Sequence, residues 1–168
     1  MERGIYPLKK FKYLSLFSLL FVFILSGCNK RIDNYYMSLM GESESWRLTN
    51  YEIVLNEKDF KAGNGTLTYK NEQQTMTDWF EFSTHAVINN KDTVVHQNAV
   101  SGPSTELKEK STGSIAGPTF IDENNKPITI DQVDSIYVVI KWKDENNKEV
   151  EERIDLYSKE NRGESFLN

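Results

Sequence analysis

Hydrophobic and polar residues alternate along much of the chain after residue 45, which is the pattern of β-strands with one buried face. The clearest stretch is 135–143, where large apolar side chains occupy every second position. Residues 150–157 resume the alternation after a polar turn, so the two stretches predict a β-hairpin. The apolar face of this hairpin consists of Ile136, Val138, Ile140, Trp142, Val150, Ile154 and Leu156.

Residues 46–56 alternate in two phases. Trp46 and Leu48 lie on one face, whereas Tyr51 and Ile53 continue that face only after a shift of one residue. A β-bulge near residues 49–50 reconciles the two phases. Weaker patterns predict further strands at 66–70, 77–89, 93–97 and 114–116, and a strand or helical turn within 128–134.

The strand at 77–89 has two distinct faces. Its predicted inner face consists of Phe80, Phe82, Ala86 and Ile88, and its outer face of Trp79, Glu81, Ser83, His85 and Val87. Residues 57–64 and most of 98–118 lack a strand pattern and predict connections.

About seven short strands separated by polar turns, without a convincing helix, predict an all-β fold. We expect an antiparallel immunoglobulin-like sandwich over residues 44–158, followed by a polar tail at 159–168. An open barrel is the alternative. The cysteine pair of antibody domains is absent, so the likeness concerns architecture alone.

The N-terminus has a different pattern from the rest. The first dozen positions carry four basic residues and one acidic residue, and an uncharged apolar run follows at 13–25. At about a dozen residues this run matches the hydrophobic part of a signal peptide and is short for a membrane span. It ends in Leu25, Ser26, Gly27 and Cys28, the last being the only cysteine of the chain.

These four residues resemble the lipobox of bacterial lipoproteins, in which a cysteine follows leucine and two small residues. The resemblance implies that the Cys28 thiol becomes a diacylglyceryl thioether and that a dedicated peptidase cleaves before it. Acyl chains such as palmitate would then hold the protein on the outer, extracytoplasmic face of the cell membrane. On this interpretation, a signal-peptide helix occupies 1–27, and the lipidated cysteine and a flexible tether occupy 28–43.

Composition narrows the range of partners. The signal peptide carries four of the 20 basic and one of the 25 acidic residues, so the remainder has a net charge of about −8. This charge argues against nucleic acid as a partner, because binding to phosphate needs clustered Lys and Arg. With Cys28 lipidated, no thiol remains for a disulfide, a zinc ligand or a nucleophile. The Gly41–Trp46 opening, Gly-Glu-Ser-x-x-Trp, resembles small Gram-positive lipoproteins without an established activity.

Two sets of residues are candidates for metal sites, and the first also has a simpler explanation. Asp-Glu-Asn-Asn-Lys occurs at 122–126 and again at 144–148, and oxygen-rich loops of this kind bind calcium. Asp and Asn also favour the left-handed backbone of tight turns. His85 and His96 lie on neighbouring predicted strands and, with Glu81, would form a transition-metal site if they faced each other.

An exposed aromatic patch is a further candidate: Trp79 together with Tyr137 or Tyr157 would suit a sugar or a protein. No motif of a known catalytic site occurs, so we assign no catalytic residue, metal ligand or cofactor. The sequence therefore predicts a non-enzymatic binding or interaction module whose ligand is an unknown protein or small molecule. A cell-envelope hydrolase and a calcium-dependent ligand-binding module are the alternatives.

Overall fold

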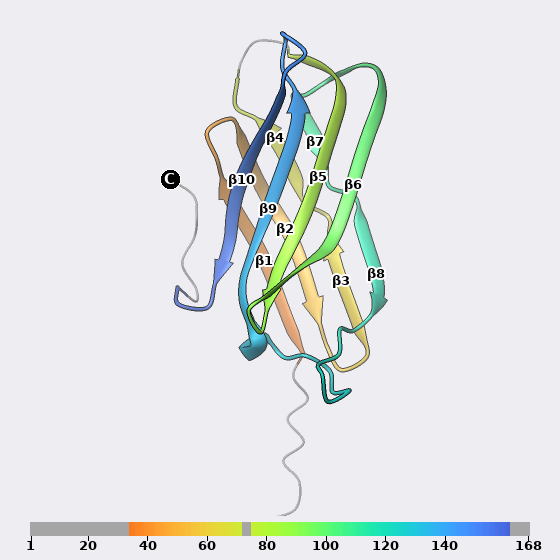
Figure 1. Cartoon of the computed structure of the whole chain (residues 1–168), viewed down its shortest axis with the longest axis vertical. Coiled ribbons are helices and arrows are strands. Elements are labelled where there is room, and N and C mark those ends of the chain that lie inside the picture. Colours follow the sequence, from red (N-terminus) through yellow and green to blue (C-terminus); the bar gives the residue numbers. More distant parts are fainter. Residues whose placement is uncertain (1–33, 72–74, 162–168) are drawn as a thin grey trace, which may run out of the picture. The chain divides into compact units, whose positions relative to one another are not determined.

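The computed structural model describes residues 34–71 and 75–161, which form ten β-strands and one short 3-10 helix. All strand pairs are antiparallel, and the strands make two sheets that face each other (Figure 1). The prediction of an all-β antiparallel sandwich is therefore confirmed. The predictions for the signal peptide, its lipobox and Cys28 lie outside the described residues. Within those residues, no helix is long and apolar enough to cross a membrane.

The first sheet, sheet A, is built around β2. One edge of β2 pairs with β1, and the other edge pairs first with β4 and then with β3. β7 and β8 continue the sheet beyond β4 and β3. The strands of sheet A are β1 (Tyr35–Glu42), β2 (Trp46–Leu55), β3 (Asp59–Gly63), β4 (Thr66–Tyr69), β7 (Glu109–Ser111) and β8 (Ser114–Pro118).

β3 and β4 are two halves of one long strand, as are β7 and β8. The first break falls at Asn64 and the second at Gly113, and both have left-handed φ angles, 60° and 68°. The breaks lie side by side, because the Asn64 backbone N–H donates to the Gly113 carbonyl oxygen at 2.8 Å. These paired breaks raise the number of strands by two, and β1 is a third strand that the sequence does not predict.

The second sheet, sheet B, has the order β10-β9-β5-β6. Its strands are β5 (Met76–Ile88), β6 (Lys91–Glu106), β9 (Val133–Lys143) and β10 (Glu149–Ser158). The 3-10 helix η1 (Ile130–Gln132) leads into β9 and lies within the stretch where a helical turn was one of two predicted alternatives. β6 is far longer than the predicted strand at 93–97, and its second half lies within the predicted loop. That half is exposed on both faces, so its sequence lacks alternation.

The core lies between the two sheets. Trp46 is completely buried, with ring centroids 4.9 Å from Tyr69, 5.5 Å from Phe80 and 5.7 Å from Trp142. A side chain of this size stabilises the fold by about 3–5 kcal/mol relative to alanine. The inward residues predicted for β9 and β10 are buried or, for Val150, packed against the core.

The predicted tether at 28–43 is wrong in its second half, because residues 35–42 form β1. Tyr36 and Ser38 point to solvent, while Tyr35, Met37 and Leu39 pack on the core. The folded domain therefore begins at least nine residues before the predicted boundary at 44, and only residues 29–34 separate it from Cys28.

The predicted bulge in β2 is confirmed, because Asn50 has a φ of 54° and the β1–β2 register shifts between Leu39 and Gly41. The prediction that 57–64 is only a connection is wrong, since most of it forms β3. β3 was missed because Phe60 and Ala62 are its only apolar inward residues.

Candidate functional site

Five polar and aromatic residues meet on the outer face of sheet B, and we call them the Tyr137 cluster. They are Ser83, His85, Asp92, Tyr137 and Arg153. The alternation of β5 turns residues 83 and 85 outward, since Phe82 and Thr84 face the core. The pairing register between β5 and β9 then places His85 directly opposite Tyr137.

Tyr137 is the centre of a stack of planar groups. The His85 ring lies nearly parallel to the Tyr137 ring, at 4.8 Å between centroids and 13° between planes. The Arg153 guanidinium carbon lies 3.7 Å from the centroid of the same ring. Because β9 lies between β5 and β10, the imidazole and the guanidinium approach from opposite sides. Asp155 fixes the guanidinium further, since Nε donates to its Oδ1 at 2.8 Å.

Asp92, near the start of β6, ties the stack together. Its Oδ2 accepts a hydrogen bond from the Tyr137 hydroxyl at 2.7 Å, and its Oδ1 lies 3.2 Å from His85 Nδ1. The bond from Tyr137 is the main cause that lowers the pKa of Asp92. Partial burial, and then the same bond, raise the pKa of Tyr137. The carboxylate therefore stays ionised and the phenol stays protonated at neutral pH.

Ser83 contacts the second nitrogen of the His85 ring, which gives the cluster an arrangement known from catalytic sites. Its Oγ lies 3.2 Å from His85 Nε2, while the other imidazole nitrogen faces Asp92. This is the serine–histidine–carboxylate order used in acyl transfer. Ser83 is only 6% exposed, however, and β5 is paired along both edges at this point. The backbone N–H groups around it are engaged in the sheet and are not placed to stabilise an oxyanion.

The candidate metal site of His85, His96 and Glu81 is not assembled, because the two histidines lie on opposite faces of sheet B. The β5–β6 register shifts after Thr84, and the extra residue in β6 is Val95. Val95 and His96 are therefore both buried, whereas His85 faces outward. In the part of the chain that the structure describes, no group of three His, Cys, Asp or Glu side chains is placed to hold a metal ion.

His96 instead joins a hydrogen-bonded chain inside the core. Its Nδ1 lies 2.9 Å from the Tyr51 hydroxyl, and Thr84 Oγ1 donates to that hydroxyl oxygen at 2.8 Å. With Thr84 as the donor, the Tyr51 hydroxyl is left to donate to a neutral imidazole. Burial lowers the pKa of His96 and raises the pKa of Tyr51, which keeps both groups uncharged.

The two Asp-Glu-Asn-Asn-Lys segments are identical turns. In the first, Asp122 Oδ1 accepts the backbone N–H groups of Asn124 and Lys126 at 2.8 and 2.9 Å. In the second, Asp144 Oδ1 accepts the corresponding two at 2.9 Å. Asn125 and Asn147 have left-handed φ angles of 58° and 62°. The repeat is thus explained by turn geometry, and the two turns lie at opposite ends of the sandwich (Figure 1).

The candidate aromatic patch is not assembled. Trp79 is next to Phe80, which pairs with Trp142, five residues along β9 from Tyr137 or about 17 Å in an extended strand. Tyr157 packs against the core. The sequence placed His85 on an outer face, but it carried no signal for the register that brings Tyr137, Asp92 and Arg153 to it.

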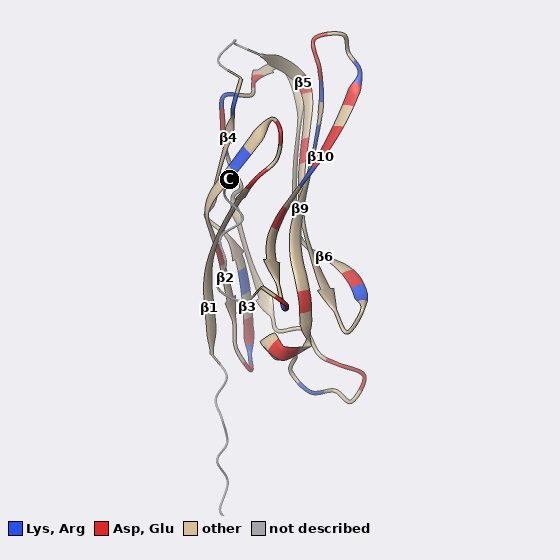
Figure 2. Ribbon diagram, turned by 90° about the vertical axis from the view of Figure 1, so that its left-hand side faces the viewer, with Lys and Arg blue, Asp and Glu red and all other residues tan. Residues whose placement is uncertain are grey.

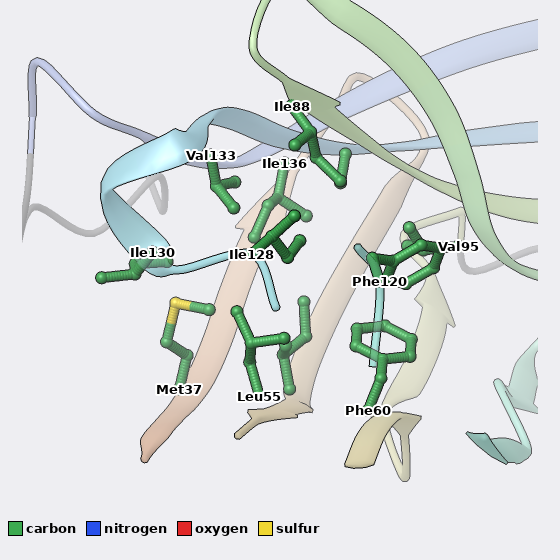
Figure 3. A pocket seen from close by; sticks show the side chains of 12 residues that line it. Met37, Leu55, Phe60, Ile88, Val95, Phe120, Ile128, Ile130, Val133 and Ile136 are labelled. Atoms are coloured by element: carbon green, nitrogen blue, oxygen red, sulfur yellow. The ribbon is translucent and has the colours of Figure 1, made fainter. Parts of the chain in front are cut away.

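An apolar cavity lies between the sheets, at the end where β1 begins (Figure 3). It has a volume of about 20 Å³, enough for roughly one water molecule, and its lining offers no polar partner for one. It is therefore a packing gap of the core. The residues around it include Met37, Leu55, Phe60, Phe120, Ile130 and Ile136.

Comparison with known proteins identifies no family: no family model matches the chain, and no curated protein matches it.

Proposed function

We propose that this protein is a lipid-anchored binding module on the extracytoplasmic face of the membrane, and that the Tyr137 cluster is its binding surface. The cluster is the observation that carries the proposal. Tyr and Arg are the residues that most often dominate binding energy at protein interfaces. Here both are already held in one arrangement, so a partner loses little side-chain entropy by binding them.

The shape of the surface favours a protein over a small molecule as the partner. Small ligands bind in concave pockets, whereas the cluster lies on the open face of a sheet. Charges of both signs surround it, including the Lys141–Glu151 pair at 3.2 Å. A partner with a flat surface and alternating charges of its own fits this face best.

The anchor part of the proposal rests on Leu25, Ser26, Gly27 and Cys28 and on the short spacer after them. Six residues, 29–34, span at most about 20 Å when extended, so the sandwich stays near the bilayer. Mass spectrometry of the mature N-terminus should find acyl chains on Cys28, and Cys28→Ala should release the protein from the membrane fraction. Recovery of a chain that still begins with Met1 and has a free thiol would refute the anchor.

The binding surface is tested by crosslinking in intact cells. Tyr137→Ala and Arg153→Ala should each abolish the crosslink to the partner, because they dismantle the stack. Tyr36→Ala is the matched control, since Tyr36 is an exposed tyrosine of sheet A that donates to Glu52 at 2.8 Å. An unchanged crosslink in Tyr137→Ala, or an equal loss in Tyr36→Ala, would contradict the proposal.

One observation favours a second candidate, a cell-envelope hydrolase: the placement of Ser83, His85 and Asp92. An organophosphonate probe should then label Ser83 covalently, and labelling should disappear in Ser83→Ala and fall in His85→Ala. Absence of labelling in the folded protein would eliminate this candidate, as the missing oxyanion donors lead us to expect.

A further inference from the structure

Each sheet has two edges, and they differ in how they are protected. On one side of the sandwich, β1 and β10 close against each other, because a Cβ on Gly41 would lie 2.6 Å from the Asp155 carbonyl oxygen. β10 also carries five charged residues, which make its edge hard to pair with another strand (Figure 2). On the other side, the β6 edge is interrupted at Gly102 and Pro103, where its register with β5 shifts.

β8 has no charged side chain, and its only proline, Pro118, is its last residue. All five residues of its Ser-Ile-Ala-Gly-Pro sequence are exposed, and no charged residue occurs between 111 and 121. Within the described chain it pairs only with β3. An exposed edge without charged side chains is a template on which another strand can pair.

The hydrogen bonds to β3 show which backbone groups of β8 are unused. Gly113 O accepts from Asn64 N at 2.8 Å, and Thr119 N donates to Lys58 O at 2.9 Å. In an antiparallel pair the bonding residues alternate, so Ile115 and Gly117 also face β3. The N–H and C=O groups of Ser114 and Ala116 therefore point away from the sheet. Pro118, which has no N–H, takes the next outward position, where proline is tolerated.

Apolar side chains are also uncovered along this side. Ile115 lies opposite the buried Ala62, and Val100 lies opposite the buried Phe80, so both belong to inner faces. They are nevertheless 39% and 43% exposed, because neither sheet extends beyond its edge strand to cover them. Addition of a strand at β8 would cover Ile115.

We propose that β8 pairs antiparallel with β8 of a second copy of this chain, about a two-fold axis at Ala116. The two Ala116 residues then exchange N–H···O=C bonds, and each Ser114 N–H reaches the Pro118 carbonyl oxygen of the second copy. Ile115 falls opposite Gly117 of the second copy, so the largest side chain of the strand meets the smallest. The strand is thus complementary to itself in this register.

Charge is compatible with the same arrangement. Among the residues level with the two-fold axis, the nearest charged side chain is Lys61, which lies opposite Ala116 on β3. The two copies of Lys61 would be three strand spacings apart, about 14 Å, which exceeds the screening length of about 8 Å at physiological salt. The dimer leaves the outer face of sheet B free, so each membrane-bound pair would present two Tyr137 clusters.

The test uses the mature lipidated protein in its own membranes. With Cys28 acylated, Ala116→Cys supplies a single free thiol at the two-fold axis, and mild oxidation should yield a covalent homodimer. Glu151→Cys on β10 is the control for random collision and should stay monomeric. A dimer of equal yield in both variants, or a disulfide from residue 116 to a different protein, would overturn the second copy as occupant.

A second measurement does not depend on crosslinking. Sedimentation of the lipidated protein in detergent should show a dimer that shifts to monomer in Ala116→Lys, because two like charges would meet at the axis. Ala116→Ser, of similar size and without charge, should remain dimeric. A monomeric unsubstituted protein at micromolar concentration would refute the proposal, whether or not Cys28 or the Tyr137 cluster acts as proposed above.

Discussion

Thr84 and His85 are neighbours on β5, but they lie on opposite faces of sheet B and in different environments. On the inner face, Thr84 belongs to a buried hydrogen-bonded chain with Tyr51 and His96 inside the core. On the outer face, His85 belongs to a stack in contact with water, in which charged partners hold Tyr137. The two networks contain similar groups: each joins an imidazole, a phenol and a hydroxyl.

The difference shows that one extra residue in a strand determines which face of the sheet the following side chains occupy. Without the bulge at Val95, strict alternation would place residues 94 and 96 of β6 on the same face. The bulge turns His96 into the core, where it is useful only as a neutral hydrogen-bonding group. The inner network therefore serves stability, while the outer one remains available to a partner.

The largest effect should come from breaking the inner network. Tyr51→Phe removes one hydroxyl and leaves both Thr84 Oγ1 and His96 Nδ1 without their shared partner in a buried site. We expect a loss of about 1–3 kcal/mol in the free energy of unfolding, measured by urea denaturation. The matched outer substitution, Tyr137→Phe, should cost less than 1 kcal/mol, since water replaces the bond to Asp92. Equal losses would mean that the two faces do not differ as described.

A smaller effect should appear on acidification. Because burial lowers the pKa of His96 below its ordinary 6.5, the unfolded chain binds a proton that the folded chain does not. Stability is then complete above pH 6.5 and falls as pH decreases towards the folded pKa. Thermal melts between pH 7.5 and 4.5 should show this fall, and His96→Asn should remove it. His85→Asn should leave it in place, and if His85→Asn removes it instead, the fall belongs to the outer network.

The three carboxylates whose pKa values are lowered do not interfere in that pH window. Hydrogen bonds lower the pKa values of Glu52, Asp92 and Asp122 from ordinary values of 4.5, 3.8 and 3.8. Their contributions are present above those ordinary values and are lost only as pH falls further. A titration of stability should therefore separate the histidine step from the carboxylate step.

The smallest effect should come from the cation in the outer stack. Arg153→Ala removes an exposed cation–π contact, for which we expect a cost of about 0.5–1 kcal/mol in unfolding free energy. The melting temperature measures this directly, and Arg47→Ala on sheet A, which removes an exposed pair with Glu42, provides a reference. A much larger cost in Arg153→Ala than in Arg47→Ala would indicate that the stack is part of the structural framework.

The faces of the central strands were predictable, because burial there imposes a period of two. The shift of phase between Leu48 and Tyr51 even indicated the bulge at Asn50. Edge strands were harder, since at the edge of a sheet even the inner face is largely exposed. β1 was missed because the exposed Tyr36 interrupts its apolar pattern. The second half of β6 has no buried face, so its sequence has no alternation to detect.

The candidate site was mostly unpredictable for a different reason. His85 was placed on an outer face correctly, and Asp92 lies in the gap between the predicted strands at 77–89 and 93–97. Their meeting with Tyr137 depends on the β5–β9 register, and the orientation of His96 depends on the bulge at Val95. Register is set by pairing between distant segments, and no local pattern in either segment records it.

The crossing of Trp46 and Trp142, at 5.7 Å and 75°, also gives the molecule a built-in optical signal. Two indoles this close and this steeply inclined couple their electronic transitions, which should produce a paired band in circular dichroism. One of these indoles belongs to sheet A and the other to sheet B. The band therefore reports whether the two layers are still face to face, and it should vanish on unfolding at the moment they part.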